Sequence, residues 1–271
     1  MVNPREVENA LRDAGVSMYR LEARLLCEFA AAGGGDLDAL LSRRLVGEPI
    51  AYITGEWEFY SLPLKVTRDT LIPRSDTETL AERAIELLRG VEAPRVLDLC
   101  AGTGCIGLAI AVNVKGAEVV FGELSDAALA VCRENIRLNA KLENVDACRL
   151  MALSMSALEA PPQEFIGAFD LIVSNPPYIP SAELAGLDVS VREFEPRLAL
   201  DGAEDGLRFY RAIAERWKRA LKPRGRLVFE VGCDQSTAVQ EILRQNGYEN
   251  IAVTRDLNKI ERVIEGENAN G

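Results

Sequence analysis

The stretch VLDLCAGTGCIGLAIA, residues 96–111, decides the fold class of this 271-residue chain. It predicts a short apolar strand, a tight loop of small residues and an apolar helix, as in α/β folds that bind nucleotides. Gly102 and Gly104 let the loop backbone turn sharply and approach a ligand closely, where a Cβ would collide with it. The free amides at the start of the helix point into the same crevice. We therefore expect a ligand at this loop.

Two acidic side chains accompany the loop. Asp98 stands just before it, and Glu123 ends the next predicted strand about 20 residues further on, where an acid binds the ribose hydroxyls in nucleotide-binding folds. Acidic neighbours suit a cationic sulfonium better than an anionic pyrophosphate, which favours S-adenosylmethionine as the cofactor. Gly102, Gly104 and Gly107 also match the spacing GxGxxG, so a dinucleotide-dependent oxidoreductase remains an alternative.

Outward from this stretch, predicted strands and helices alternate along the chain. A helix is expected from Ser75 through TETLAERAIELLRG, opened by Ser or Asp capping. Further strands are predicted at 95–99, 118–122, 169–174, 226–231, 251–255 and 262–265, and further helices at 105–114, 126–138, 207–221 and 236–246. This alternation predicts an α/β fold with a mostly parallel sheet covered on both faces.

The N-terminal part has a different pattern. Leucines recur at helical spacing through residue 45, Gly33-Gly34-Gly35 predicts a helix stop, and Asp36 predicts the N-cap of the next helix. The segment EWEFYSLPLKV predicts a β-hairpin around Ser61-Leu62-Pro63. The expected organisation is an N-terminal helical domain at 1–45, a hairpin and linker at 46–75, and a catalytic domain at 76–271.

Composition narrows the possible classes of function. No apolar run approaches the roughly 20 residues of a membrane helix, and the charged N-terminus lacks the apolar core of a secretion signal. We therefore expect a cytoplasmic protein that makes no membrane contact. The net charge of −11 disfavours binding along a nucleic-acid backbone, so direct nucleic-acid binding is not expected.

Histidine is absent and the six cysteines are scattered without a CxxC pair. The absence of histidine excludes serine–histidine and cysteine–histidine catalysis and any histidine-ligated metal. Most of the cysteines stand among apolar neighbours, which is typical of buried free thiols. No metal site is expected.

The stretch FDLIVSNPPYIP, residues 169–180, predicts the place of the chemistry. Its apolar strand delivers Asn175 to the carboxyl edge of the sheet, and Pro176 and Pro177 fix the turn that follows. A planar amide or exocyclic amine is a poor nucleophile because its lone pair is delocalised. The Asn175 side-chain oxygen and the Pro176 carbonyl can each accept one N–H, which orients the nitrogen and stabilises its developing positive charge. Tyr178 can pack on the planar group, and no strong base is required.

Beyond these two stretches, the chain resembles the HemK-type protein-(glutamine-N5) methyltransferases, which modify class I peptide chain release factors. NPPY alone is shared with adenine-N6 and other nucleic-acid methyltransferases, so the long flanking matches carry the resemblance to glutamine-modifying enzymes. The matching segments are RRLVGEPIAYITGEWEFYSLPLKV, LIPRSDTE, LDLCAGTGCIGLAIA, VSNPPYIP, VREFEPRLALDGAEDGLRFYRAI, GRLVFEVGCDQ and RDLNKIERVIEG.

The resemblance implies a fold, a cofactor, a substrate and a set of site residues. The fold is the class I S-adenosylmethionine-dependent methyltransferase fold, a seven-stranded, mostly parallel sheet with an antiparallel final strand. The substrate is the glutamine of the Gly-Gly-Gln motif in the release factors, with the N-terminal helices helping to bind the protein. The implied cofactor residues are Asp98, Cys100, Ala101, Gly102, Thr103, Gly104, Glu123 and Asn175. Asn175, Pro176, Pro177 and Tyr178 bind the glutamine, and Asn175, Pro176 and Tyr178 are catalytic.

The sequence departs from the family pattern at several positions. Cys100-Ala101 replaces the usual Gly-Thr, Glu123 replaces aspartate, and Ser75-Asp76 replaces a common Pro-Glu. Near the adenine, where the family usually has an acidic residue followed by an aromatic one, this chain has only Ser154, Met155 and Ser156.

Three alternatives follow from the same residues. A nucleic-acid amino methyltransferase would use the same NPPY, but the acidic charge and the lack of a basic insert argue against it. An oxidoreductase would use the GxGxxG match, yet the chain has neither a Tyr-x-x-x-Lys pair nor a histidine to move protons. A binding protein that kept the fold without turnover would fit the altered adenine region.

Overall fold

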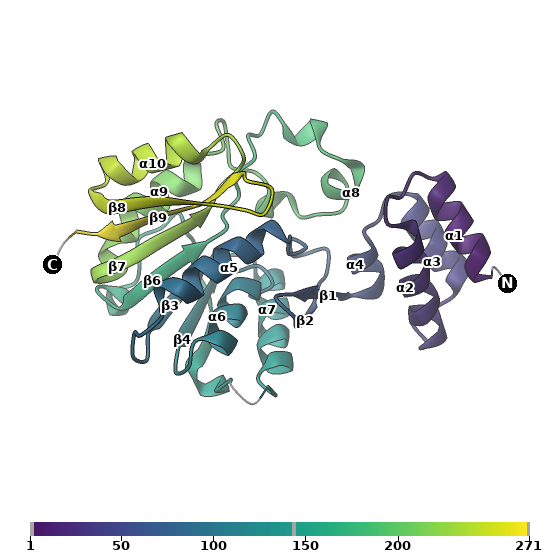
Figure 1. Ribbon diagram of the computed structural model, residues 1–271, viewed down its shortest axis with the longest axis horizontal. Helices are drawn as coiled ribbons and strands as arrows, with labels where there is room; N and C mark the ends of the chain where they lie inside the picture. The colour runs from purple at the N-terminus through teal and green to yellow at the C-terminus, as the bar shows by residue number, and fades with distance from the viewer. Residues whose placement is uncertain (1–2, 143–144, 270–271) are drawn as a thin grey trace.

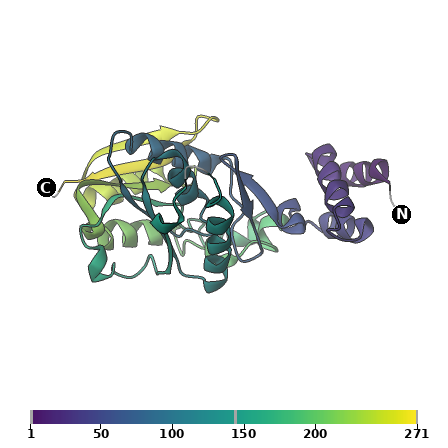
Figure 2. The same ribbon diagram turned by 90° about the horizontal axis from the view of Figure 1, so that it is seen from below.

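A small helical bundle and an α/β domain are joined by a hairpin segment (Figure 1). The computed structural model describes residues 3–142 and 145–269. In two views the bundle stands apart from the sheet and its helices, at the N-terminal end of the long axis (Figure 2). In the part of the chain that is described, no helix has the length and apolar character to cross a membrane.

Three helices form the N-terminal bundle, as their leucine pattern predicts. They are α1 (Pro4–Asp13), α2 (Tyr19–Ala31) and α3 (Leu37–Leu45). Their apolar faces meet in a core that includes Val7, Leu11 and Leu26. The predicted N-cap is confirmed, since the Asp36 side chain accepts a hydrogen bond from the Ala39 amide at 3.1 Å.

The linker segment contains the short helix α4 (Ile50–Thr54) and the predicted hairpin, formed by β1 (Glu56–Phe59) and β2 (Leu62–Lys65). The expected turn position is wrong by one to two residues. The turn consists of Tyr60 and Ser61, both with positive φ, while Leu62 and Pro63 lie in β2. Positive φ at both turn residues matches the twist of the flanking strands, which explains the tight two-residue connection.

A seven-stranded sheet forms the centre of the larger domain, and the expected class I methyltransferase fold is confirmed. Its order is β5-β4-β3-β6-β7-β9-β8, and β9, the last strand in sequence, is antiparallel to both neighbours. The remaining pairs are parallel. The strands are β3 (Arg95–Leu99), β4 (Glu118–Glu123), β5 (Leu150–Ser154), β6 (Phe169–Ser174), β7 (Leu221–Glu230), β8 (Tyr248–Arg255) and β9 (Glu261–Asn268).

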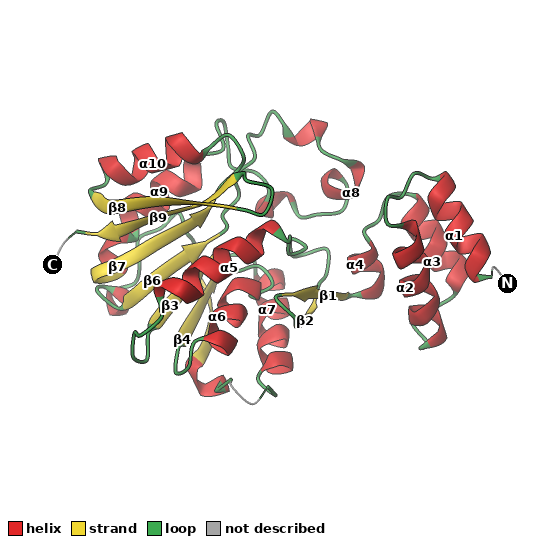
Figure 3. Cartoon of the chain, viewed as in Figure 1, coloured by secondary structure: helices red, strands yellow, loops and turns green. Residues whose placement is uncertain are grey.

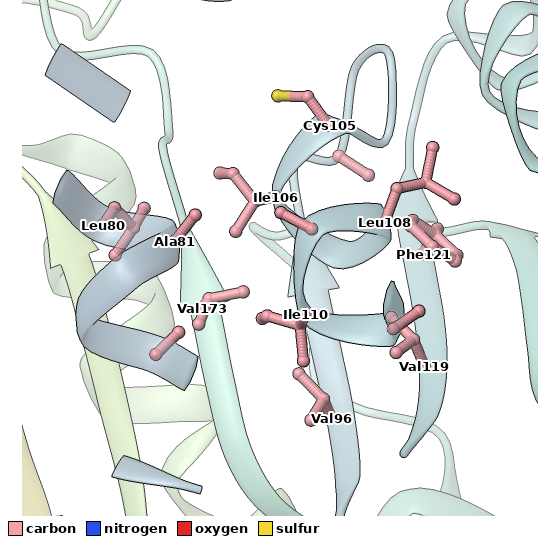
Figure 4. Close-up of a cluster of buried hydrophobic side chains, with 14 of the residues drawn as sticks. Leu80, Ala81, Val96, Cys105, Ile106, Leu108, Ile110, Val119, Phe121 and Val173 are labelled. Atoms are coloured by element: carbon pink, nitrogen blue, oxygen red, sulfur yellow. The ribbon is translucent and has the colours of Figure 1, made fainter. Parts of the chain in front are cut away.

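Helices cover both faces of this sheet (Figure 3). They are α5 (Asp76–Leu87), α6 (Cys105–Asn113) and α7 (Asp126–Asn139) on one face, with α9 (Arg208–Arg216) and α10 (Ser236–Gln245) on the other, and the short α8 (Val189–Arg192) beyond the sheet edge. Alternate side chains of β3 enter the two cores, with Val96 in one and Leu97 in the other. Figure 4 shows Ile106 and Ile110 of α6 near Val173 of β6 and Val96 of β3 in the first core.

Three local expectations differ from the structure. Ser75 makes no side-chain cap, because its backbone is already helical and the Thr77 amide bonds the Arg74 carbonyl. The helix predicted at 207–221 ends at Arg216, and Leu221 instead begins β7, opposite Phe169. Periodicity did not indicate β5, a partly exposed edge strand without a buried apolar run.

Candidate active site

A cavity of about 650 Å³ lies at the carboxyl ends of β3, β4, β5 and β6. This is the edge where open α/β sheets bind ligands, and the volume lies in the range of small-molecule sites. In Figure 3 the arrowheads of β6 and β7 point to the side of the sheet that carries the segment with α8. The expected residues that line it are Cys100, Ala101, Gly102, Thr103, Glu123, Asn175 and Pro177, together with Met155 and Ser156. Asp98, Gly104, Ser154, Pro176 and Tyr178 are outside its lining.

The loop after β3 is held by the end of β4. The Gly102 amide donates to Glu123 Oε2 at 2.9 Å, and the Ser125 amide donates to Oε1 at 2.8 Å. Each carboxylate oxygen therefore keeps a lone pair for a ligand hydroxyl. Gly102 has a φ of 54°, and no atom of residues 3–142 or 145–269 outside its immediate neighbours lies within 4 Å of the position that a Cβ would take. A side chain there would project into open space beside the cavity.

The other two glycines of the GxGxxG match serve protein packing. A Cβ on Gly104 would lie 2.8 Å from Cys132 Sγ, and one on Gly107 would lie 2.4 Å from the Phe121 ring. The expectation that a Cβ at Gly104 would collide with a ligand is therefore wrong, since it would meet α7 and β4. These glycines allow α6 to lie close on the sheet.

Cys100 takes a backbone conformation that usually requires glycine. Its φ is 65°, and its amide and that of Ala101 both donate to the Gly122 carbonyl. A non-glycine residue in this region costs free energy because Cβ crowds the backbone. Burial raises the pKa of the Cys100 thiol above its usual range, so the thiol is neutral at physiological pH.

Asp98, in β3 just before the loop, is fully buried. Its Oδ2 accepts the Gly107 amide at 2.9 Å, while Oδ1 has no hydrogen-bond partner among the described residues. Burial raises the pKa of Asp98 to about 7. A carboxyl group of this kind can neutralise positive charge at the loop or support the N-terminus of α6.

The Asn175-Pro176-Pro177-Tyr178 turn presents Asn175 and Pro177 to the cavity. Asn175 Nδ2 donates to Thr77 Oγ1 at 3.3 Å. Tyr178 packs against the second core, its carbonyl accepts Gln235 Nε2 at 2.8 Å, and burial raises the pKa of its hydroxyl to about 12. The structure thus places Asn175 at the cavity wall and Tyr178 behind it.

Sequence reasoning missed three side chains at this site. Thr77 of α5 lines the cavity, and Glu230, the last residue of β7, is buried beside it. Phe209 of α9 places an aromatic ring in the lining. The stretches LIPRSDTE, GRLVFEVG and GLRFY, which carry the family resemblance, were the available signal for these residues.

The described residues contain no cluster of three or more cysteine or acidic side chains arranged to hold a metal ion. The polar residues that line the cavity supply carboxylate, carboxamide and hydroxyl groups, and they include Arg197 and Arg208. The carboxylate, carboxamide and hydroxyl groups bind hydroxyls, amides and cations.

Known proteins resemble this chain along most of its length. A family model described as "Methyltransferase small domain" matches residues 77–189. The release factor glutamine methyltransferase of Bordetella pertussis is 40% identical over 278 residues, which cover 96% of this chain and 98% of that protein. That of Fusobacterium nucleatum is 38% identical over 227 residues and 84% of this chain, which spans only 62% of the Fusobacterium protein.

A solved structure shares the fold at low sequence identity. The hMettl16 catalytic domain in complex with MAT2A 3'UTR hairpin 6 has a TM-score of 0.60 at 15% identity, covering 84% of this chain and 82% of that chain. At that identity the likeness shows the fold alone.

Proposed function

The chain belongs to the family of release factor glutamine methyltransferases, and we propose that it methylates the side-chain amide nitrogen of a glutamine in class I peptide chain release factors. The methyl donor is S-adenosylmethionine, and the glutamine is that of the Gly-Gly-Gln motif. The observation that carries the proposal is that Glu123 and Asn175, from two separate sequence motifs, line one cavity. Family membership decides against the nicotinamide-dependent oxidoreductase.

The residues of the cavity fit S-adenosylmethionine. Gly102 leaves room for close approach, and Glu123 has lone pairs for the two ribose hydroxyls. Asp98 Oδ1, which has no hydrogen-bond partner among the described residues, lies behind the same loop, where negative charge favours a sulfonium. We propose that the cofactor residues are Asp98, Cys100, Ala101, Gly102, Thr103, Gly104, Glu123 and Asn175.

The proposed mechanism depends on positioning. When bound, S-adenosylmethionine supplies an electrophilic methyl group. Asn175 accepts one N–H of the substrate amide, and the Pro176 carbonyl accepts the other, so that the nitrogen faces the donor side of the cavity. The nitrogen would gain the methyl group as the methyl–sulfur bond of the donor breaks, leaving a neutral thioether, and would then lose a proton to solvent. Both acceptors stabilise the positive charge that develops on nitrogen before the proton leaves.

We propose that the N-terminal bundle contributes to binding the release factor, as a domain of residues 1–45. Its support is an ionic link, centred on the buried Glu48 carboxylate, to the segment beside the cavity. Glu48, 2% exposed, pairs with Arg43 of α3 at 2.8 Å and with Arg68 at 2.8 Å, and Asp69 next to it lines the cavity. An acidic enzyme attracts a basic protein domain more readily than a phosphate backbone. A cytoplasmic location follows from this proposed substrate, which acts on ribosomes.

Transfer of labelled methyl from S-adenosylmethionine tests this function with three acceptors. They are a class I release factor, its Gln-to-Ala variant in the Gly-Gly-Gln motif, and total RNA and DNA. We expect label on the first alone, with mass spectrometry placing a single methyl group on the glutamine. Label on nucleic acid would instead support the amino methyltransferase alternative, and equal label on the Gln-to-Ala factor would refute the glutamine assignment.

A further inference from the structure

We propose that Thr77 and Glu230 are positioning residues that turn the Asn175 carboxamide so that its oxygen faces the methyl acceptor. The identity of that acceptor rests on the proposed function, whereas the orientation of Asn175 can be measured without any substrate. Neither residue belongs to the sequence motifs from which the site was predicted.

Three distant segments bring these side chains together. Asn175 follows β6, Thr77 is the second residue of α5, and Glu230 is the last residue of β7. In the parallel β6–β7 pair, Ser174 lies opposite Phe229, so the next residues on the two strands are Asn175 and Glu230. Asn175 Nδ2 lies 3.3 Å from Thr77 Oγ1. Both Thr77 and Glu230 are 2% exposed.

Hydrogen-bond accounting decides which end of the carboxamide faces Glu230. An ionised carboxylate only accepts hydrogen bonds, and Glu230 Oε2 is buried without a partner among the described residues. Hydrogen bonding from the Thr77 hydroxyl and from the Asn175 carboxamide lowers the pKa of Glu230. Both groups therefore act as hydrogen-bond donors to this carboxylate. A carboxamide oxygen turned toward this carboxylate would be repelled. The NH₂ group therefore faces Thr77 and Glu230, and Oδ1 is left for the cavity.

This orientation has a consequence for the reaction. A carboxylate behind the NH₂ group polarises the carboxamide and makes Oδ1 a stronger acceptor. Positive charge develops on the substrate nitrogen during transfer, so a more negative Oδ1 stabilises the transition state more than the ground state. A protonated Glu230 loses this effect, because a neutral acid no longer attracts the NH₂ group.

The surroundings of Glu230 place its titration near neutral pH. The pKa of Glu230 is raised to about 7, mainly by burial. The hydrogen bond from Thr77 and the positive charge of Arg262 lower this pKa, but by less than burial raises it. The titratable groups that face it are Arg262 on β9, Asp76 on α5, Cys105 on α6, Tyr178 after β6 and Tyr210 on α9. Arg262 is paired with Asp76 at 3.1 Å. Burial holds the pKa values of the thiol and the two phenols well above neutrality.

Burial also raises the pKa of Asp98 to about 7. A Glu230 variant is therefore needed to assign a pH effect near 7 to Glu230.

The first test uses the ¹⁵N-labelled full chain without substrate. The side-chain NH₂ signals of Asn175, assigned by their loss in Asn175→Ala, should shift with pH with a midpoint near 7. Glu230→Gln should remove this titration, while the matched control Glu249→Gln, at an exposed position on β8, should retain it. A wild-type Asn175 signal that does not move between about pH 5.5 and 8.5 would overturn the proposal, and this outcome requires no variant to fold.

The second test separates positioning from binding. Thr77→Val and Glu230→Gln should each lower kcat roughly 10- to 100-fold, with KM for S-adenosylmethionine within about 2-fold. Thr77→Ser, which keeps the hydroxyl, should restore most of the rate, and Thr254→Val on β8 should have no effect. The rate of the wild type should rise with pH through about 7 and that of Glu230→Gln should not. Wild-type kcat in both Thr77→Val and Glu230→Gln would refute the positioning role. If the wild type labels no release factor, the proposed function fails, and the Asn175 titration alone decides the present inference.

Discussion

The two walls of the cavity are built in different ways. The proposed cofactor wall depends on the main chain of the loop after β3, whose Gly102 amide donates to the Glu123 side chain, 21 residues away. The transfer wall depends on side chains from distant segments, as in the bond between Asn175 and Thr77, 98 residues apart. Substitutions should therefore act on the first wall through backbone conformation and space, and on the second through lost side-chain polarity.

The largest effect is expected on the cofactor wall. Gly102→Val should abolish S-adenosylmethionine binding, with Kd raised roughly 1,000-fold or more, because the added side chain takes up the open space at the cavity lining and is strained at a φ of 54°. Isothermal titration calorimetry measures this. Gly90→Val is the matched control, since Gly90 has a φ of 81° and open space around it but lies outside the cavity lining. Equal loss of affinity in both variants would mean that backbone strain, and not occupied space, is responsible.

On the transfer wall, the largest expected effect is on turnover. Asn175→Ala should lower kcat by roughly 100-fold or more while leaving the Kd for S-adenosylmethionine within about 3-fold, as removal of a preorganised polar group does. Single-turnover methyl transfer and calorimetry measure the two quantities. A variant that loses cofactor affinity and turnover together would show that the two walls are not separable at Asn175.

The same contrast explains how much could be predicted from the sequence. Gly102 and Glu123 were predicted because the strand–loop–helix pattern and the spacing to the next strand are local. Asn175 was predicted because two prolines mark its turn. Thr77 and Glu230 were missed although they lie in stretches that carry the family resemblance, because their contacts with Asn175 arise from strand register and helix packing and not from a local pattern.

Other errors have the same physical origin. Ser75 precedes a helix as a capping residue should, yet a turn through Arg74 already makes its backbone helical. Gly104 was assigned to ligand approach, although it is the packing of Cys132 and Phe121 that requires glycine there. A sequence pattern predicts that a glycine or a serine matters, and tertiary contacts decide the reason.

A smaller effect on the cofactor wall should come from the Glu123 side chain. Glu123→Ala should weaken S-adenosylmethionine binding by roughly 1–3 kcal/mol, since a charged acceptor for hydroxyls is lost. The same change removes the hydrogen-bond acceptor of the Gly102 and Ser125 amides. Glu123→Gln keeps the size of the side chain and should lose less affinity. An unchanged Kd in Glu123→Ala, measured by calorimetry, would contradict the assignment of this carboxylate to the cofactor.

The smallest effect, on stability, tests whether backbone conformation governs the cofactor wall even without ligand. Cys100 has a φ of 65°, so glycine should be tolerated there, with an unfolding free energy within about 0.5 kcal/mol of wild type, because relief of Cβ crowding offsets the added chain entropy. Cys100→Val should destabilise by about 1–2 kcal/mol, since a β-branched residue fits this region poorly.

Cys132, buried within helix α7, provides the opposite case for this comparison. Glycine at Cys132 leaves a void and lowers helix propensity, so Cys132→Gly should be the more harmful change and Cys132→Val the milder one. Urea unfolding of the four variants measures both rankings. If glycine is the better tolerated residue at position 100 and valine the better tolerated one at position 132, then φ decides which residue the loop accepts, and packing decides which residue the helix accepts. The same ranking at both would mean that side-chain packing also controls the cofactor loop, and the contrast between the two walls would no longer hold.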